Sequence, residues 1–394
     1  MSTRSVIVAG ARTPIGRFRG GFAPLRAVDL GGAAIQAAVE RAGIEPGQVE
    51  YTIMGHVIGA GAGQITARQA AIAGGIPKEI PAVTVNKVCL SGMSAIAQAD
   101  QMIRAGELDV VVAGGMESMT NAPYVLPKAR EGARLGHTTM LDSMIHDGLW
   151  CAFEDQHMGE GTDGMNAELG ISREDQDAWA ARSHHRANAA WEDGRMAEEV
   201  VAVEVLGRKG DVAVVDRDEG IRADSSAAAL ADLKPAFSEN GTVTAGNASQ
   251  ISDGACAIVV TSLEAADRLG LEPVAEIVAH GMSADRYPSL HTVPAIAMER
   301  ALKKAGSSAA DLGLVEINEA FAAVSLHASR MLGVDGSLVN VMGGAVALGH
   351  PIGASGARIV LSLAYELRRR HANLGGAAIC GGGGQGDALV LRSL

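Results

Sequence analysis

Two thiols, one imidazole and one amide each follow an apolar run that is typical of a strand. They are Cys89 after PAVTVNKV, Asn318 after LVEI, His350 after VNVMGGAVALG and Cys380 after GAAI. In open α/β sheets, sites form beyond the carboxyl ends of the strands. A thiol within reach of an imidazole can carry nucleophilic acyl chemistry. Their convergence predicts an active site, although each alone could also be a core or helix-capping residue.

Cys89 stands where a strand-like run turns into a helical one. The run Pro81–Val88 alternates like a strand, and apolar residues recur at helical spacing after Gly92. The positive end of a helix dipole favours thiolate, which is the nucleophilic form of cysteine. We therefore expect Cys89 to be a thiolate nucleophile. The alternative is a buried cysteine that packs as a small hydrophobe.

Strand-like and helical runs alternate along both ends of the chain. Helices are expected near Asp29–Ala42 and Ile65–Ala73, between strands such as SVIVAG, YTIMGHVIG and LDVVVAGG. This rhythm predicts an α/β fold with a largely parallel sheet.

A repeat relates the two ends of the chain. The segment Ala38–His56 aligns without gaps to Ala301–Glu319. Further on, the strand SLVNVM, the turn GHPIGASG, the helix ARIVLSLAYELRRR and the strand GAAICGGGG repeat the order found around Cys89. Two similar halves sharing one core are expected. The rhythm stops between Met116 and Gln250, which predicts an insertion that covers the active site.

Composition narrows the functional classes. The chain has 394 residues, 47% of them hydrophobic, and a net charge of −12, which argues against a general nucleic-acid binder. A basic stretch with Arg208, Lys209, Arg217 and Arg222 is one candidate for an anionic ligand, but its acidic neighbours favour a mixed-charge surface. No apolar run is long enough for a membrane span and no signal-peptide core is found, so a cytoplasmic location is expected.

Several further residues are expected to be structural. The four cysteines are widely spaced without a C-x-x-C pair, which argues against a zinc ribbon or a redox motif. Cys151 and Cys256 are expected to pack in the core. His184 and His185, on a polar helix, are expected at the surface. The glycines of GAGAG do not complete a dinucleotide-binding G-x-G-x-x-G motif, so a dehydrogenase is a weak alternative.

Seven blocks of the chain resemble the signature blocks of the thiolase family, in the same order and over nearly the full length. They are NKVCLSGMSAI, GGMESM, HMG, TAGNASQISDGA, VEINEAF, GGAVALGHPIGASGAR and CGGGGQGDAL. The chain looks most similar to the short-chain, biosynthetic branch. The resemblance implies two α/β halves in a layered αβαβα core. The halves would be residues 1–119 with 250–271, and residues 272–394, with 120–249 as an inserted loop domain that binds coenzyme A (CoA).

The resemblance also implies a reaction. Two acetyl-CoA molecules would condense reversibly to acetoacetyl-CoA and CoA, the activity of an acetyl-CoA C-acetyltransferase. Cys89 would take the acetyl group, His350 would activate Cys89, and Cys380 would remove a proton from the second acetyl-CoA. The enolate oxygen would be stabilised by His350 and a water held by Asn318, and a second oxyanion hole would use the N–H groups of Cys89 and Gly382.

The family likeness further places residues around the acyl and CoA site. They are Leu149, His157, Met158, Arg222, Ser249, Ala320 and Phe321. No permanent cofactor or metal is expected, CoA and acetyl-CoA being substrates, and neither nucleic acid nor a membrane is an expected partner. A homodimer or homotetramer is the family's common state.

Two departures and two alternatives stay open. Met342 stands where the family often has Asn, and Gln250 where many biosynthetic members have Gly. Both are expected to bear on loop packing and chain-length preference rather than on the reaction. A degradative 3-ketoacyl-CoA thiolase acting on longer chains would use the same chemistry. A silent CoA-thioester binding protein would be expected to lack Cys89, His350 or Cys380, and all three are present.

Overall fold

A mixed ten-stranded sheet organises the computed structural model, which describes residues 3–207 and 210–394. Nine strands follow one another in the order β14 (Leu314–Ile317), β15 (Leu374–Gly381), β16 (Gln385–Ser393), β13 (Ala275–Ala284), β1 (Ser5–Arg12), β12 (Ser252–Ser262), β5 (Val110–Ser118), β3 (Tyr51–Gly55) and β4 (Ala82–Val85). The short strand β2 (Gly16–Arg17) pairs with β12. The predicted strand before Cys89 is therefore present, and it ends at Val85.

The two predicted halves are visible in the strand order. Counted outward from the middle of the sheet, one half has the strand order β1, β12, β5, β3, and the other half has the matching order β13, β16, β15, β14. The halves meet between β1 and β13, where two residue pairs join them, Val6 with Glu276 and Ile7 with Ala275. Helices α1 (Ala27–Ala42) and α8 (Val293–Ala305) end alike, at Gly43 and Gly306 with φ of 69° and 66°. Glycine adopts this left-handed conformation without a Cβ penalty. The repeat is confirmed.

The largely parallel sheet was a wrong expectation. β3 pairs in parallel with β4 and β5, and β14 with β15, whereas the remaining pairings along the sheet are antiparallel. In the second half, β15 and β16 are joined by a tight turn, so they form a hairpin that needs no crossover helix.

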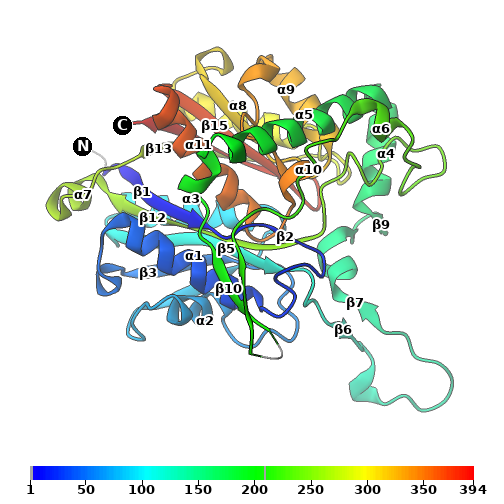
Figure 1. The fold of residues 1–394 in the computed structure, drawn as a ribbon, viewed down its shortest axis with the longest axis horizontal. Helices are drawn as coiled ribbons and strands as arrows, with labels where there is room; N and C mark the ends of the chain where they lie inside the picture. The colour runs from blue at the N-terminus through cyan, green and yellow to red at the C-terminus, as the bar shows by residue number, and fades with distance from the viewer. Residues whose placement is uncertain (1–2, 208–209) are drawn as a thin grey trace.

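Helices and sheet halves alternate in five layers. Val111 of β5 and Leu389 of β16 pack into one buried cluster with Ile96 of α3 (Ser91–Arg104) and Ile359 of α11 (Ser355–Arg370). The opposite faces pack on α1 and α2 (Thr66–Ala73) in one half, and on α8 and α9 (Ala322–Leu332) in the other. Figure 1 shows these outer helices on opposite sides of the molecule. The αβαβα core is confirmed.

The segment SLVNVM does not form the predicted strand. Residues 336–338 make a 3₁₀ turn, and Val339 makes only an isolated bridge to Val315. The reason is Asn340, whose backbone is left-handed with φ of 51°. Its side-chain amide accepts from Ile317 N and donates to Ile317 O, both at 2.8 Å, and so takes the place of a strand partner.

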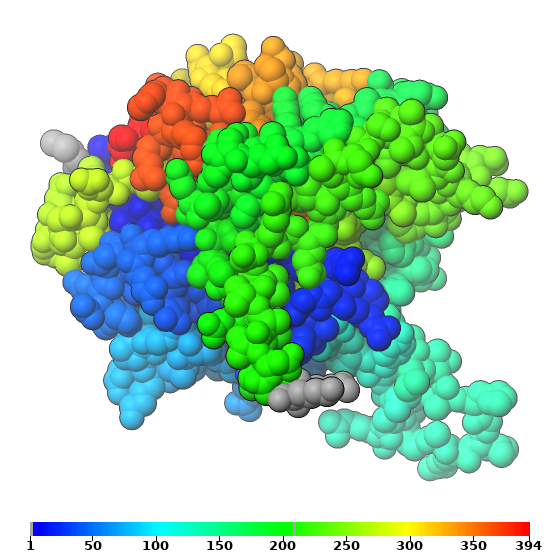
Figure 2. Space-filling view, viewed as in Figure 1, coloured from blue at the N-terminus to red at the C-terminus, as the bar shows by residue number. Residues whose placement is uncertain are grey.

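The region between β5 and β12 wraps one side of this core. It contains β6 (Tyr124–Val125), β7 (Leu141–Asp142), β8 (Trp150–Cys151), β9 (Gln156–His157), α4 (Met158–Leu169), α5 (Arg173–Glu192), β10 (Val203–Leu206), β11 (Val212–Val215) and α6 (Ala227–Ala231). In Figure 2 the segment between β6 and β7 projects from the body. Helix α7 (Leu263–Leu269) follows β12, and the short α10 (Ala345–Leu348) precedes His350. The boundaries at 119, 249 and 271 remain a prediction.

Two surface expectations have different outcomes. His184 on α5 is 2% exposed, and its Nδ1 accepts a hydrogen bond from Arg222 N at 3.1 Å, because the loop at Arg222 covers that face of the helix. The surface prediction was wrong for His184, and His185 is exposed as expected. Arg217 and Arg222 are exposed, while Arg208 and Lys209 lie outside the described residues.

Over the described ranges, no helix has both the length and the apolar character of a membrane span.

Candidate active site

The two helices at the centre of the molecule bring the predicted catalytic turns together. A Cβ on Gly92 of α3 would lie 2.8 Å from Ala357 N, and one on Gly356 of α11 would lie 2.5 Å from Met93 N. Only residues without a Cβ allow so close a crossing. Cys89 precedes α3 by two residues and His350 precedes α11 by five, so this crossing sets one turn beside the other.

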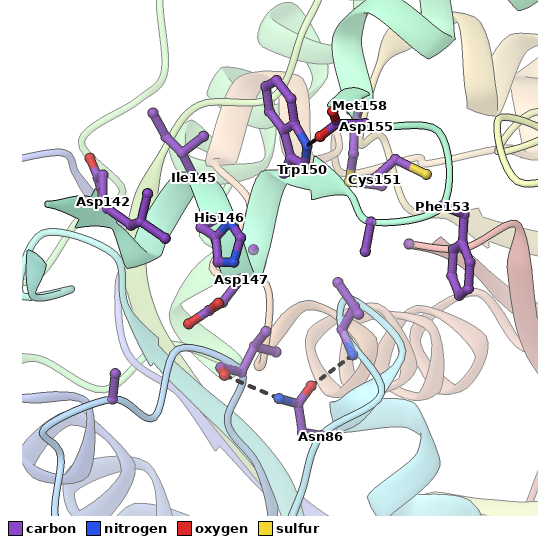
Figure 3. Close-up of a pocket in the computed structure, with 18 of the residues that line it drawn as sticks. Asn86, Asp142, Ile145, His146, Asp147, Trp150, Cys151, Phe153, Asp155 and Met158 are labelled. Atoms are coloured by element: carbon purple, nitrogen blue, oxygen red, sulfur yellow. Dashed lines mark hydrogen bonds between the residues drawn. The ribbon is translucent and has the colours of Figure 1, made fainter. Parts of the chain in front are cut away.

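The turn that carries Cys89 is strained. Val88 has φ of 51°, which is unusual for a β-branched residue. Asn86 Oδ1 accepts from Val88 N at 3.1 Å, and Asn86 Nδ2 donates to Val57 O at 3.1 Å, as Figure 3 shows. Ser91 Oγ donates to Val88 O at 2.6 Å. Strain that surrounding contacts hold in place is a common feature of functional sites.

The Cys89 sulfur is not a resting thiolate. Burial raises the pKa of this thiol to about 12; hydrogen bonds from the N–H groups of Cys89 and Gly382 oppose this rise, and the nearby Glu117 carboxylate adds to it. The expected effect of the helix N-terminus is outweighed because the side chain is 4% exposed. Cys89 therefore needs a base to remove its proton, and two backbone donors already meet at its sulfur.

His350 has the properties of that base. Its Nδ1 lies 2.6 Å from Ser355 Oγ, and Ser355 Oγ donates to Pro351 O at 3.0 Å. The single hydroxyl proton goes to the carbonyl, so Ser355 accepts from Nδ1–H and leaves Nε2 with its free lone pair. Nε2 is buried and has no hydrogen-bond partner among the described residues. Burial, with Arg358 nearby, lowers the pKa of His350 to about 3, so the imidazole is neutral.

Asn318 directly follows β14 and faces His350. Its Nδ2 lies 3.5 Å from His350 Nδ1, and its Oδ1 accepts from Arg358 Nη2 at 3.4 Å. Arg358 is in turn paired with Glu316 at 3.2 Å. Asn318 is not the cap of α9, which begins after Phe321. Its side chain is thus available to the site.

Cys380 lies near the end of β15 and is 1% exposed. Burial and the nearness of Cys89 raise the pKa of its thiol. The glycines after it have different roles from those expected. Gly382 has room for a Cβ, whose nearest neighbour would be Val88 Cγ1 at 3.5 Å. Gly384 has φ of 66°, and its Cβ would lie 2.3 Å from Arg286 O, so the turn requires glycine there.

A tunnel-like cavity of about 470 Å³ reaches His350. Six residues predicted from the sequence line it: Leu149, His157, Ser249, Ala320, Phe321 and His350. One wall is held together by the hydrogen bond from Ser249 N to Ala320 O at 3.1 Å. On another wall, His157 stacks on Phe237 with ring centres 4.6 Å apart, and burial lowers the pKa of this histidine. Of the proposed catalytic groups, His350 lines the cavity, whereas Cys89 and Cys380 are not among the lining residues.

Two predicted residues do not line this cavity. Met158 packs in a cluster with Cys380 and Phe321, and its Cε would be 3.7 Å from a Cβ on Gly382. Its thioether is therefore close to the catalytic turns. Arg222 is exposed and contributes its backbone N–H to His184.

Sequence reasoning missed other lining residues, among them Arg17, Phe18 and Phe237, and it named Gln250, which also lines the cavity, only as a departure from the family. Arg17 is the only formally charged side chain that lines the cavity among the described residues. It stands in strand β2, opposite Ser252 of β12, in the stretch GRFRGGF. The two arginines of that stretch were the available signal. Gln250 Nε2 donates to Gly220 O, Val346 O and Ala347 O at 3.0 to 3.3 Å, so this departure from the family connects the loop at Gly220 to helix α10.

A larger hollow of about 1070 Å³ lies on the outer side of the nucleophile turn. Figure 3 shows its wall, formed by side chains between Asp142 and Met158 and by Asn86. Cys151 borders this hollow, and Cys256 is 1% exposed in the core, so both are buried packing residues. Among the catalytic candidates, only Gly382 borders it. The smaller cavity is therefore the better candidate for the substrate site. Within the described ranges, no three His, Cys, Asp or Glu side chains are grouped to hold a metal ion.

Comparisons with known proteins match nearly the whole chain. The model of the thiolase N-terminal domain matches residues 5–264, and that of the thiolase C-terminal domain matches residues 271–393. A probable acetyl-CoA acetyltransferase of Mycolicibacterium smegmatis is 54% identical, with 98% of this chain and 100% of the relative covered. An acetyl-CoA acetyltransferase of Pseudomonas aeruginosa is 50% identical, with 98% of each covered. The crystal structure of the Bacillus anthracis acetyl-CoA acetyltransferase superposes with a TM-score of 0.97 at 41% identity, covering 100% of this chain and 99% of that one.

Proposed function

Because the chain belongs to the thiolase family, we propose that it is an acetyl-CoA C-acetyltransferase that forms and cleaves acetoacetyl-CoA. The observation that carries this proposal is the arrangement around Cys89. Its sulfur meets two backbone N–H donors and lies near a second buried thiol, while a neutral imidazole stands on the adjoining turn. Such a set provides a nucleophile, a base, an oxyanion hole and a second acid–base group.

The first step acylates Cys89. His350 Nε2 takes the thiol proton as the sulfur attacks the thioester carbonyl of acetyl-CoA. The oxyanion that forms accepts hydrogen bonds from Cys89 N–H and Gly382 N–H. The C–S bond to CoA breaks, and the departing thiolate takes the proton of Cys380. This leaves acetyl-Cys89, a Cys380 thiolate and a His350 imidazolium, which balance each other in charge.

The second step forms the carbon–carbon bond. The Cys380 thiolate removes an α-proton from a second acetyl-CoA. Its raised pKa makes it a strong base, as a weakly acidic C–H requires. The enolate oxygen would be stabilised by His350 Nε2–H and a water held by Asn318. The enolate carbon attacks acetyl-Cys89, and the released Cys89 sulfur takes the proton of His350, so all three groups return to their starting states.

Substrate binding extends the same proposal. We assign the insertion, residues 120–249, to CoA, with the cavity that His350 lines for the pantetheine arm. Met158 and Phe321, packed against Cys380, would limit the acyl group to a short chain. Arg222 would contact the nucleotide end from the surface. The family's dimer or tetramer and a cytoplasmic location stay predictions, and light scattering of the purified protein would test the first.

The deciding measurement compares the CoA-dependent cleavage of acetoacetyl-CoA with that of a six- or eight-carbon 3-ketoacyl-CoA. Preference for acetoacetyl-CoA, abolished by Cys89→Ala, is expected. Cys151→Ala is the matched control, because it removes a buried thiol that the mechanism does not use. If the longer substrate is preferred, the mechanism stands and the protein belongs to the degradative class. If neither substrate is cleaved, the proposal is overturned.

A further inference from the structure

Asp387 of β16 is a fully buried carboxylate that the mechanism does not use. It is 0% exposed. Lys87 Nζ lies 2.8 Å from its Oδ1, and Ser94 Oγ donates to its Oδ2 at 2.8 Å. His280 Nε2, on β13, lies 3.8 Å from Oδ1. Each carboxylate oxygen therefore has a donor of its own.

The partners of this carboxylate belong to the two catalytic segments. Asp387 pairs across the hairpin with Ile379, the neighbour of Cys380. Lys87 stands two residues before Cys89, and Ser94 lies in the first turn of α3. One carboxylate thus connects the strand of the second thiol to the turn and the helix of the first, across about 300 residues of sequence.

The energetics of this buried charge pairing indicate what it can contribute. Burial alone would raise the pKa of Asp387, and His280 and Lys87 hold it below its ordinary value, so the group is ionised. A buried ion pair adds little net stability, because the desolvation of the charges offsets their attraction. It does impose a fixed geometry, since leaving either charge unpaired is costly. A role in positioning therefore fits better than a role in stability.

We propose that Lys87 and Asp387 are positioning residues that set the separation of the two catalytic sulfurs, Cys89 and Cys380. The inference rests on the proposed function, in which the carbon deprotonated by Cys380 must reach the acyl group on Cys89. A small error in that separation lowers the rate of bond formation steeply. The intrinsic reactivity of Cys89 depends on His350 and on the N–H groups of Cys89 and Gly382, and the side chains of Lys87 and Asp387 bond to none of these.

The test uses Asp387→Asn, which keeps the shape of the side chain and removes its charge. The kcat of acetoacetyl-CoA thiolysis is expected to fall at least about tenfold with KM unchanged. The rate of Cys89 alkylation by iodoacetamide is expected to stay within about threefold of the parent, as the base and the oxyanion donors are untouched. A merely structural role would lower both together.

Further variants change Lys87, whose side chain is partly exposed, so that misfolding is less of a concern. Lys87→Met is expected to behave as Asp387→Asn does, and the double variant should be no worse than either, because the two residues act as one unit. Lys87→Arg, which keeps the charge, should restore at least about a third of the parental kcat. Arg268→Met breaks an exposed pair with Asp109 at 2.8 Å and should have no effect.

The outcomes separate this inference from the proposed function. If the parent cleaves acetoacetyl-CoA and Asp387→Asn retains its kcat, the positioning role is overturned and the function stands. An equal loss of thiolysis and of Cys89 alkylation would also overturn it. A parent that cleaves no 3-ketoacyl-CoA would overturn the proposed function and, with it, this inference.

Discussion

Ser355 Oγ lies 2.6 Å from Nδ1 of His350, and Ser355 is the first residue of helix α11. The hydroxyl also donates to Pro351 O at 3.0 Å, so it can only accept from the imidazole. This fixes the proton on Nδ1 and the lone pair on Nε2. Ser355 thus decides which nitrogen of His350 can act as a base.

Ser355→Ala is expected to lower kcat about 100-fold while KM changes little, because the imidazole loses its fixed tautomer and orientation. Steady-state thiolysis of acetoacetyl-CoA measures both constants. Ser329→Ala is the matched control, since Ser329 is a buried helix serine that donates to Ser325 O in the same manner. An unchanged kcat in Ser355→Ala would show that the tautomer is set by another group.

Arg17 places a positive charge on a cavity that is otherwise lined by uncharged side chains in the described part of the chain. CoA carries phosphate groups, so Arg17→Gln should raise KM for acetoacetyl-CoA about tenfold with little change in kcat. Arg19→Gln, two residues away and outside the cavity lining, should leave KM unchanged. The KM of an acetoacetyl thioester of pantetheine, which lacks the nucleotide, should be the same in parent and Arg17→Gln. If Arg17→Gln raised the KM of both substrates, a contact between Arg17 and a phosphate group would be contradicted.

Much of this site could be predicted from the sequence because it is carried by local patterns. Strand ends, glycine turns and the repeat are short-range features, and they led to Cys89, His350, Cys380 and Asn318. The resemblance then supplied their roles. The strands before Cys89 and Asn318 lie at opposite edges of the sheet, and the close crossing of α3 and α11 brings their ends together.

What the sequence did not predict depends on distant contacts. The raised pKa of Cys89 follows from burial, which outweighs the local helix dipole. His184 is buried because the loop at Arg222 folds over it. The strand expected at Val339 is lost to the side chain of Asn340. Asp387 was not singled out in the sequence, since its partner Lys87 is about 300 positions away.

The raised pKa of Cys89 makes a prediction about its reactivity. Since burial raises this pKa to about 12, the thiolate fraction should increase about tenfold for each pH unit below that value. Alkylation of Cys89 by iodoacetamide, followed by mass spectrometry of its peptide, should therefore accelerate from pH 7 to pH 10 without levelling off. A free cysteine levels off near its pKa of about 8.5 and serves as the reference. A plateau for Cys89 by pH 8 would mean that the site stabilises the thiolate at rest.

Acid stability should depend on His291, which is 0% exposed with its Nε2 2.9 Å from Asn166 Oδ1. Burial, with His327 nearby, lowers the pKa of His291 to about 3, whereas the unfolded chain has a pKa of about 6.5. Below pH 6.5 the unfolded state binds the extra proton, so the stabilisation is complete above that pH and is lost as the pH falls toward 3.

His291→Gln keeps a donor toward Asn166 and cannot titrate. The parent should therefore lose about 2 kcal/mol more unfolding free energy than this variant between pH 7 and pH 5. Urea unfolding at the two pH values measures the difference, and contributions from other titrating groups cancel in the comparison. A constant offset between His291→Gln and the parent at the two pH values would mean that His291 accepts its proton in the folded protein as easily as in the unfolded chain.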